Sequence, residues 1–239
     1  MPLAAHAHFS THWQTKASCK PSRIQYQIAN QRLISARSRD GKNLTVDEIT
    51  SGIVNATNID PDFVLGFTQT AFNNLGVPLT GTIGLSDLDD HGVTEHDASL
   101  TRLDIIQGET LLVHPVMVQD MLNDAPYDVN YLNTTSLGRT RARRESESKA
   151  AGSPPLPAGF ENLALGEAGL VLLLLGTGGE TNPDERQALK WQVGEWFDLE
   201  RFPWGWKKSP RILTVADDLN PIVGRIVYWQ QYWAGQFSK

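Results

Sequence analysis

Two segments combine helical spacing of apolar residues with clear helix-start signals. Thr45-Val-Asp-Glu48 has the form of a capping box, in which Thr45 and Glu48 each bond a free backbone N–H. Asp60 and Pro61 suit the N-cap and the first turn of a second helix, which Gly76 and Pro78 would end. The apolar faces of these two helices are Val46, Ile49, Ile53 and Val54, then Phe63, Val64, Phe67, Ala71, Phe72 and Leu75.

Weaker patterns predict more helices and no persistent strand. The expected segments run over about 98–107, 115–122, 133–149 and 162–175, and from Asn182-Pro183 to about residue 201. The stretch Gly81–Gly92 is expected to be a loop. The fold class is therefore all-α, with one helical domain over residues 23–239 after a mobile tail of residues 1–22.

One of these helices is unusually rich in charge. The segment 133–149 has Arg139, Arg141, Arg143 and Arg144, followed by Glu145 and Glu147. Alternating charge of this kind is typical of a solvated helix face, so we expect these arginines to lie in solvent.

Composition excludes several classes of protein. Acidic residues outnumber basic ones by 27 to 21, which argues against a nucleic-acid binder with a basic face. The single cysteine, Cys19, excludes an intrachain disulfide framework. The longest apolar run, Leu170–Leu175, is far too short to span a membrane. The first residues lack a basic and an apolar signal region, which by itself predicts a cytosolic chain.

Ionisable side chains gather in Glu95-His-Asp-Ala-Ser-Leu-Thr-Arg102. Burial of such a group is costly unless its members are paired or bound. One interpretation is a cation site formed by the Glu95 carboxylate, the His96 carbonyl and the Ser99 hydroxyl. The other is a helix start capped by Asp97.

Glu167 is a single acid in an otherwise apolar helix, Leu163–Leu175. A carboxylate there needs a partner at a cavity wall, because its burial alone would be strongly destabilising. A nearby imidazole would orient it as a general acid–base group.

Three motifs together resemble those of the fungal haem-thiolate peroxidases, the family of chloroperoxidase and the unspecific peroxygenases. They are Arg39-Asp-Gly-Lys-Asn43, Glu95-His-Asp-Ala-Ser99 and Gly166-Glu-Ala168, and the resemblance spans roughly residues 28–215. It is closest to the short members, which have Glu-His-Asp where long members have Glu-Gly-Asp.

The resemblance implies a helical fold around haem b and a reaction of H₂O₂ with a small organic substrate or a halide. It also implies that Glu167 is the distal acid–base group, that His96 orients it, and that Glu95, the His96 carbonyl and Ser99 bind Mg²⁺. Members of the family are secreted, unlike the expectation from this N-terminus.

The chain departs from the family at the iron ligand. The family has Pro-Cys-Pro where this chain has Pro21-Ser22-Arg23, and Cys19 lies three residues upstream. A serine hydroxyl is a poor iron ligand, because it ionises far less readily than a thiol. Three explanations stay open: a wrong junction of coding segments upstream, a haem-free or inactive relative, and binding of iron by Cys19 after local rearrangement. A haem-free relative would be a helical protein that binds small apolar molecules.

Overall fold

The computed structural model describes residues 41–108 and 112–237, and within them the protein is helical as expected. Residues 1–40 lie outside this part, and with them the expected tail, Cys19 and Ser22. The α-helices are α2 (Val46–Thr57), α3 (Pro61–Asn74), α4 (Pro115–Asn123), α5 (Thr134–Ala151), α6 (Ala158–Leu175), α7 (Lys190–Leu199) and α8 (Asn220–Phe237). The all-α prediction is confirmed.

Short elements connect the helices. They are the 3₁₀ turns η1 (Leu85–Asp89), η2 (Ile105–Gln107) and η3 (Pro183–Glu185), the π turn η4 (Val215–Leu219), and the strands β1 (Tyr131–Leu132) and β2 (Ala188–Leu189). The two strands pair antiparallel.

Local capping explains where α2 and α3 begin. The Thr45 hydroxyl accepts from the Glu48 amide, and the Glu48 carboxylate accepts from the Thr45 amide. Asp60 accepts from the Asp62 amide in front of Pro61. Both starts were predicted, because the capping residues lie within one turn of each other in the chain.

Three sequence-based expectations are wrong. Residues 98–107 form an irregular loop that ends in η2, because aspartate side chains bind backbone amides that a helix would use. The expected helix from Asn182 to about residue 201 is divided into η3, β2 and α7. Helix α8, which the pattern did not indicate, closes the described chain.

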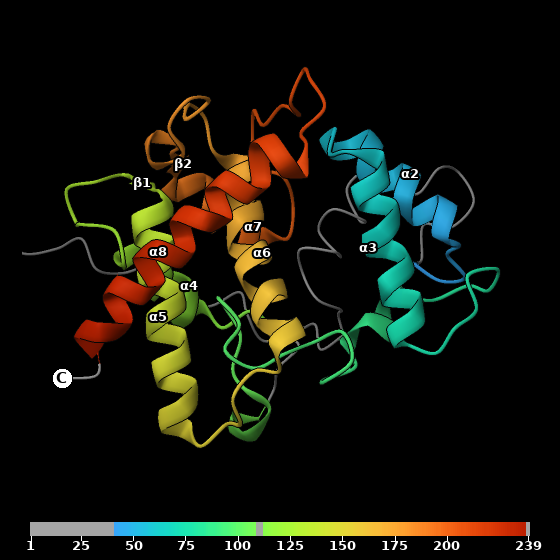
Figure 1. Cartoon of the computed structure of the whole chain (residues 1–239), viewed down its shortest axis with the longest axis horizontal. Coiled ribbons are helices and arrows are strands. Elements are labelled where there is room, and N and C mark those ends of the chain that lie inside the picture. Colours follow the sequence, from blue (N-terminus) through green and yellow to red (C-terminus); the bar gives the residue numbers. More distant parts are fainter. Residues whose placement is uncertain (1–40, 109–111, 238–239) are drawn as a thin grey trace, which may run out of the picture.

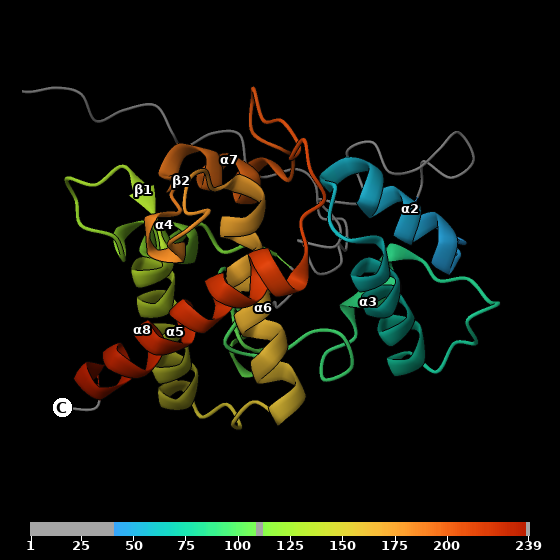
Figure 2. The same cartoon turned by 45° about the horizontal axis from the view of Figure 1, so that its top comes forward.

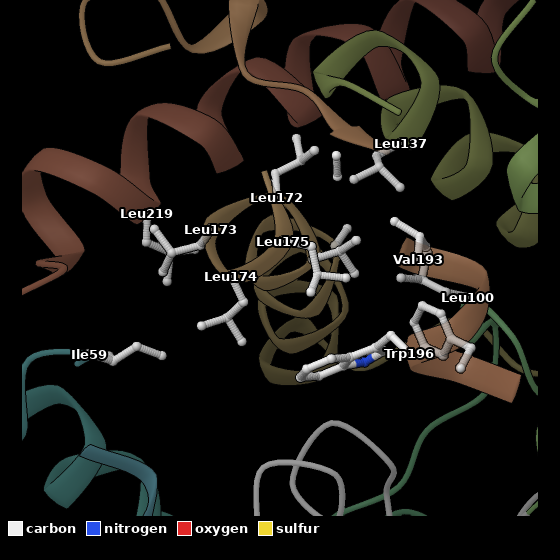
Figure 3. Close-up of a cluster of buried hydrophobic side chains, with 14 of the residues drawn as sticks. Ile59, Leu100, Leu137, Leu172, Leu173, Leu174, Leu175, Val193, Trp196 and Leu219 are labelled. Atoms are coloured by element: carbon white, nitrogen blue, oxygen red, sulfur yellow. The ribbon is translucent and has the colours of Figure 1, made fainter. Parts of the chain in front are cut away.

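Helix α6 lies at the centre of the fold (Figure 1). Its last turn is buried on every side, and Leu172, Leu173, Leu174 and Leu175 contact different neighbours in the core. Figure 3 shows these leucines among Leu137 of α5, Val193 and Trp196 of α7, and Leu219. The apolar run of α6 is therefore core and not a membrane segment; no helix in the described ranges is long and apolar enough to cross a bilayer.

Helix α8 runs across α5 and α6, whereas α2 and α3 form a pair on the other side of α6 (Figures 1 and 2). The crossing of α5 and α8 is very close, since a Cβ at Gly138 would lie 2.5 Å from Cβ of Trp229. Helix α5 therefore packs closely against α8, and one face of α5 is buried.

Candidate active site

The loop of residues 91–104 is irregular, but dense hydrogen bonding holds it. The Asp104 carboxylate accepts from the Ala98 amide at 2.9 Å, and the Asp97 carboxylate accepts from the Ile105 amide at 2.8 Å. Ala98 has a φ of +54°, a left-handed conformation that a residue with a side chain adopts only when its surroundings enforce it. The loop is therefore a fixed part of the fold, and Asp97 does not start a helix there.

This loop places His96 beside Glu167 of α6. The His96 Nε2 and Glu167 Oε2 atoms are 3.5 Å apart, and the His96 side chain is almost fully buried. Its Nδ1 lies 2.7 Å from the Asp97 carbonyl oxygen. A carbonyl can only accept, so Nδ1 donates and Nε2 is left to face the carboxylate. The ring of Phe160 packs against His96 at 5.9 Å.

The two side chains shift each other's protonation. Burial alone would lower the pKa of His96, but the Glu167 carboxylate outweighs it and the pKa is raised. Burial alone would raise the pKa of Glu167, but His96, Arg102 and Arg141 together lower it. The favoured form is therefore an imidazolium beside a carboxylate, in which the proton between the two groups lies on His96 Nε2.

Glu167 also forms part of the wall of a large apolar pocket. The pocket has a volume of about 740 Å³ and lies between α3, α6 and the start of α8. This is within the size range of small-molecule sites, roughly 300–1,000 Å³. Glu167 is the one charged side chain among the described residues that line it; the apolar wall includes Phe63, Phe67, Phe160, Leu163, Leu170 and Val223.

Two of the residues expected to bind Mg²⁺, Glu95 and Ser99, contact Arg102. Arg102 Nη2 lies 2.5 Å from Glu95 Oε2, and Arg102 Nε donates to the Ser99 hydroxyl at 3.3 Å. The other Glu95 oxygen is buried without a hydrogen-bond partner. Burial raises the pKa of Glu95 to about 7, although the Arg102 charge opposes this. The described residues hold no group of three or more histidine, cysteine or acidic side chains suited to a metal, so the magnesium prediction is not supported.

Two further residues hold the loop, Arg141 and Arg144 of α5, and neither was predicted to have this role. Both guanidinium groups are buried, so the prediction that they lie in solvent is wrong. Arg141 Nη1 donates to the Ala98 carbonyl at 2.6 Å, and Arg144 Nε donates to the Ser99 carbonyl at 2.8 Å. A usable signal was present in the spacing: they share a helix face with Leu137, which is a core residue.

A comparison with protein families identifies the family of this chain. The model of "Peroxidase, family 2", the chloroperoxidase-type family, matches residues 28–211. The chain belongs to this family. The resemblance seen in the sequence motifs is thereby confirmed. No curated protein matches the chain.

Membership in family 2 supports a peroxidase function, that is, an oxidoreductase that uses peroxide with small-molecule substrates. It also suggests a haem cofactor in general. The match covers the loop with His96 and the helix with Glu167, so the acid–histidine pair lies within the matched residues, whereas the pocket also includes Val215, Leu219 and the start of α8.

Proposed function

We propose that this family 2 peroxidase uses haem b and H₂O₂ to oxidise or oxygenate small apolar molecules, with Glu167 as the acid–base group and His96 as its orienting partner. The observation that carries the proposal is the His96–Glu167 pair at the wall of a 740 Å³ apolar pocket. A carboxylate in an apolar wall is costly unless it is paired, and a paired, perturbed carboxylate in a cleft is a candidate for acid–base chemistry.

The pair suits proton transfer to and from peroxide. Glu167 in its carboxylate form accepts a proton from H₂O₂ and afterwards returns one to the departing oxygen. His96 cannot turn away, because its Nδ1 is held by the Asp97 carbonyl and its ring packs on Phe160. The imidazolium therefore keeps one carboxylate oxygen aligned and favours the deprotonated form.

The apolar lining of the pocket suits an apolar macrocycle or an apolar substrate. Haem, when bound, would supply the iron at which peroxide reacts. Phe63, Phe67 and Leu170 would contact apolar groups, and Glu167 would face the reacting oxygen. The proposal assigns no role to magnesium, because Arg102 is the partner of Glu95 and Ser99.

A matched pair of variants on α6 tests the acid–base assignment. Glu167→Gln keeps the size of the side chain but removes the proton acceptor, so peroxide turnover should fall by about 10² to 10⁴-fold. Glu161→Gln changes an exposed acid in the first turn of the same helix and should leave turnover unchanged. Both proteins are loaded with haemin and assayed with a phenol or a benzylic alcohol. Equal turnover in Glu167→Gln and the parent would show that another group is the acid–base.

The iron ligand remains a prediction from sequence. The resemblance points to Ser22, with Cys19 three residues upstream. If a thiolate is required, the chain as written takes up haemin weakly, and Ser22→Cys with Arg23→Pro gives the red-shifted absorption of a reduced CO complex. If the unaltered chain shows this band and Cys19→Ala removes it, Cys19 is the ligand.

The pocket also favours a second function, the binding of small apolar molecules without haem. Its apolar lining and volume would serve a fatty acid or an aromatic ligand equally well. Saturable binding of a fluorescent fatty acid, with no haem absorption under any loading condition, would support this function. Haem-dependent turnover would exclude it.

A further inference from the structure

Arg141 is buried at the junction of three elements. Its relative exposure is 0 %, and its guanidinium reaches from α5 to the Ala98 carbonyl oxygen, 2.6 Å from Nη1. Charged groups are rarely buried so completely unless they are paired and hydrogen bonded. Its contact with the loop is to a backbone atom two residues from His96.

The backbone at Ala98, to which Arg141 donates, has an unfavourable conformation. Ala98 has a positive φ, a conformation that is unfavourable for a residue with a side chain and persists only where contacts enforce it. Two contacts do so from opposite sides. Asp104 accepts from the Ala98 N–H, and Arg141 donates to the Ala98 C=O. The turn directs the preceding Asp97 carbonyl toward His96 Nδ1.

Glu145 and Gln230 in turn hold the Arg141 guanidinium in place. Its Nη2 donates to Glu145 Oε1 at 3.1 Å, and the same oxygen accepts from Gln230 Nε2 of α8 at 2.5 Å. A continuous series of contacts therefore runs from α8 through Glu145 and Arg141 to Ala98, and from there to His96 and Glu167.

We propose that Arg141 is a positioning residue, which holds the Ala98 turn so that His96 stays aligned on Glu167. This inference rests on the proposed acid–base role of the pair. Arg144 does not duplicate this contact, since it holds the Ser99 and Arg102 carbonyls further along the loop. Arg141 touches neither the pocket nor any substrate position among the described residues.

The imidazole of His96 gives a direct signal of its own alignment. A ring N–H that is buried and bonded to a carbonyl exchanges slowly with water, so its proton gives a separate downfield resonance. His96→Asn identifies the resonance by removing it. The unaltered protein without added cofactor should show this signal. Arg141→Met should abolish it, because the Asp97 carbonyl is no longer directed at Nδ1.

Arg143→Met is the matched control, two residues along α5, because Arg143 binds the Asp124 and Glu147 carboxylates and not the loop. It should keep the signal. The inference is overturned if Arg141→Met keeps the signal, or if Arg143→Met loses it as completely.

Two milder substitutions distinguish a loss of positioning from a general failure of the protein to fold. Glu145→Gln loosens the hold on Arg141 at a partly exposed site and should speed exchange of the His96 ring proton without removing the signal. Arg141→Lys can still place one N–H donor near the Ala98 carbonyl and should restore part of the signal that Arg141→Met loses. If Arg141→Lys loses the signal as completely as Arg141→Met and Glu145→Gln exchanges like the unaltered protein, Arg141 has no positioning role.

The haem-loaded protein adds a kinetic readout. A misplaced pair should lower kcat of Arg141→Met by up to about 10²-fold while KM for the organic substrate stays constant. If KM rises and kcat is constant, Arg141 acts on binding and the inference fails. If no variant and no parent shows haem-dependent turnover, the proposed function fails, while the ring-proton signal still decides whether Arg141 positions His96.

Discussion

Helix α5 presents four arginines in six residues, and they have two different surroundings. Arg141 and Arg144 point inward and bind backbone carbonyls of the loop with His96. Arg139 and Arg143 instead bind the Asp124 carboxylate, with the Arg143 side chain 15 % exposed, and Arg139 also lies over the Trp233 ring. The inner pair is buried, whereas the Arg139 side chain is 42 % exposed.

The difference teaches that charge in this helix has a structural use only where it is desolvated. An exposed ion pair contributes about 0–1 kcal/mol, because water and salt screen it. Removal of one partner from a buried pair costs about 3–5 kcal/mol, because the other charge is left uncompensated. The four arginines lie on different faces of α5, and the inner two differ from the others because their face packs on the loop with His96.

The largest effect is expected for Arg144→Met. Asp104 would remain fully buried without its ion-pair partner, so the free energy of unfolding should fall by about 3–5 kcal/mol. Urea denaturation followed by circular dichroism measures this loss. A loss below 1 kcal/mol would mean that the inner and outer arginines do not differ.

A double variant sharpens this result. Asp104→Asn removes the charge that Arg144 leaves behind, so the two changes together should cost less than their sum. A coupling energy of about 0.5–3 kcal/mol is expected for residues in direct contact. Strict additivity would show that the buried pair is not the source of the loss.

Acid pH should weaken the same contact. Burial alone would raise the pKa of Asp104, but bonds from Ser148, Ser153 and the Ala98 amide, with the Arg144 charge, lower it. A lowered pKa in the fold stabilises the protein above the unfolded value of 3.8. This contribution should be lost as the pH falls below that value. The stability difference between the unaltered protein and Asp104→Asn should therefore shrink below pH 4, and a constant difference would contradict the assignment.

Ser153→Ala should have a smaller effect. The Ser153 hydroxyl donates to Asp104 at 2.6 Å, and hydrogen bonds to charged groups contribute about 1.5–3 kcal/mol. The Ala98 amide and Arg144 still bind the carboxylate in this variant, so the loss should lie at the lower end. Thermal unfolding measures it, with Ser146→Ala on the exposed side of α5 as the control.

The smallest effect is expected for Arg143→Met. Asp124 is buried, but it keeps Arg139 as an ion-pair partner, and Glu147 keeps Arg144, so a loss of only about 1 kcal/mol is expected. High salt should reduce even this difference. A loss as large as that of Arg144→Met would remove the distinction between the two sides of the helix.

The parts of the fold that could be predicted depend on local contacts. Thr45 with Glu48, and Asp60 with Pro61, act within one turn, so the starts of α2 and α3 were correct. The loop at 98–107 could not be predicted in this way, because Asp97 binds an amide eight residues away. Helix α8 was not predicted, although Pro221 in its first turn is a residue typical of helix starts.

In the candidate site, too, the features that depend on local sequence could be predicted, and those that depend on distant contacts could not. Glu167 is conspicuous as an acid in an apolar helix, and family motifs suggested His96 as its partner. Arg141 and Arg144 share the helix face of Leu137, which separates them from Arg139 and Arg143, but the carbonyl groups they bind lie 43 and 45 residues earlier in the chain and could not be predicted. Arg102 as the partner of Glu95 likewise depends on how the loop folds back on itself.

Hydrogen exchange of single amides tests most directly whether the inner arginines hold the loop. In Arg141→Met, exchange of the Ala98 amide should be faster by about tenfold or more, the equivalent of at least one hydrogen bond to a charged group. Exchange at the Ile49 amide in α2 should not change, and Arg143→Met should leave both sites as they are. Unchanged protection of Ala98 in Arg141→Met, or an equal loss in Arg143→Met, would contradict this account.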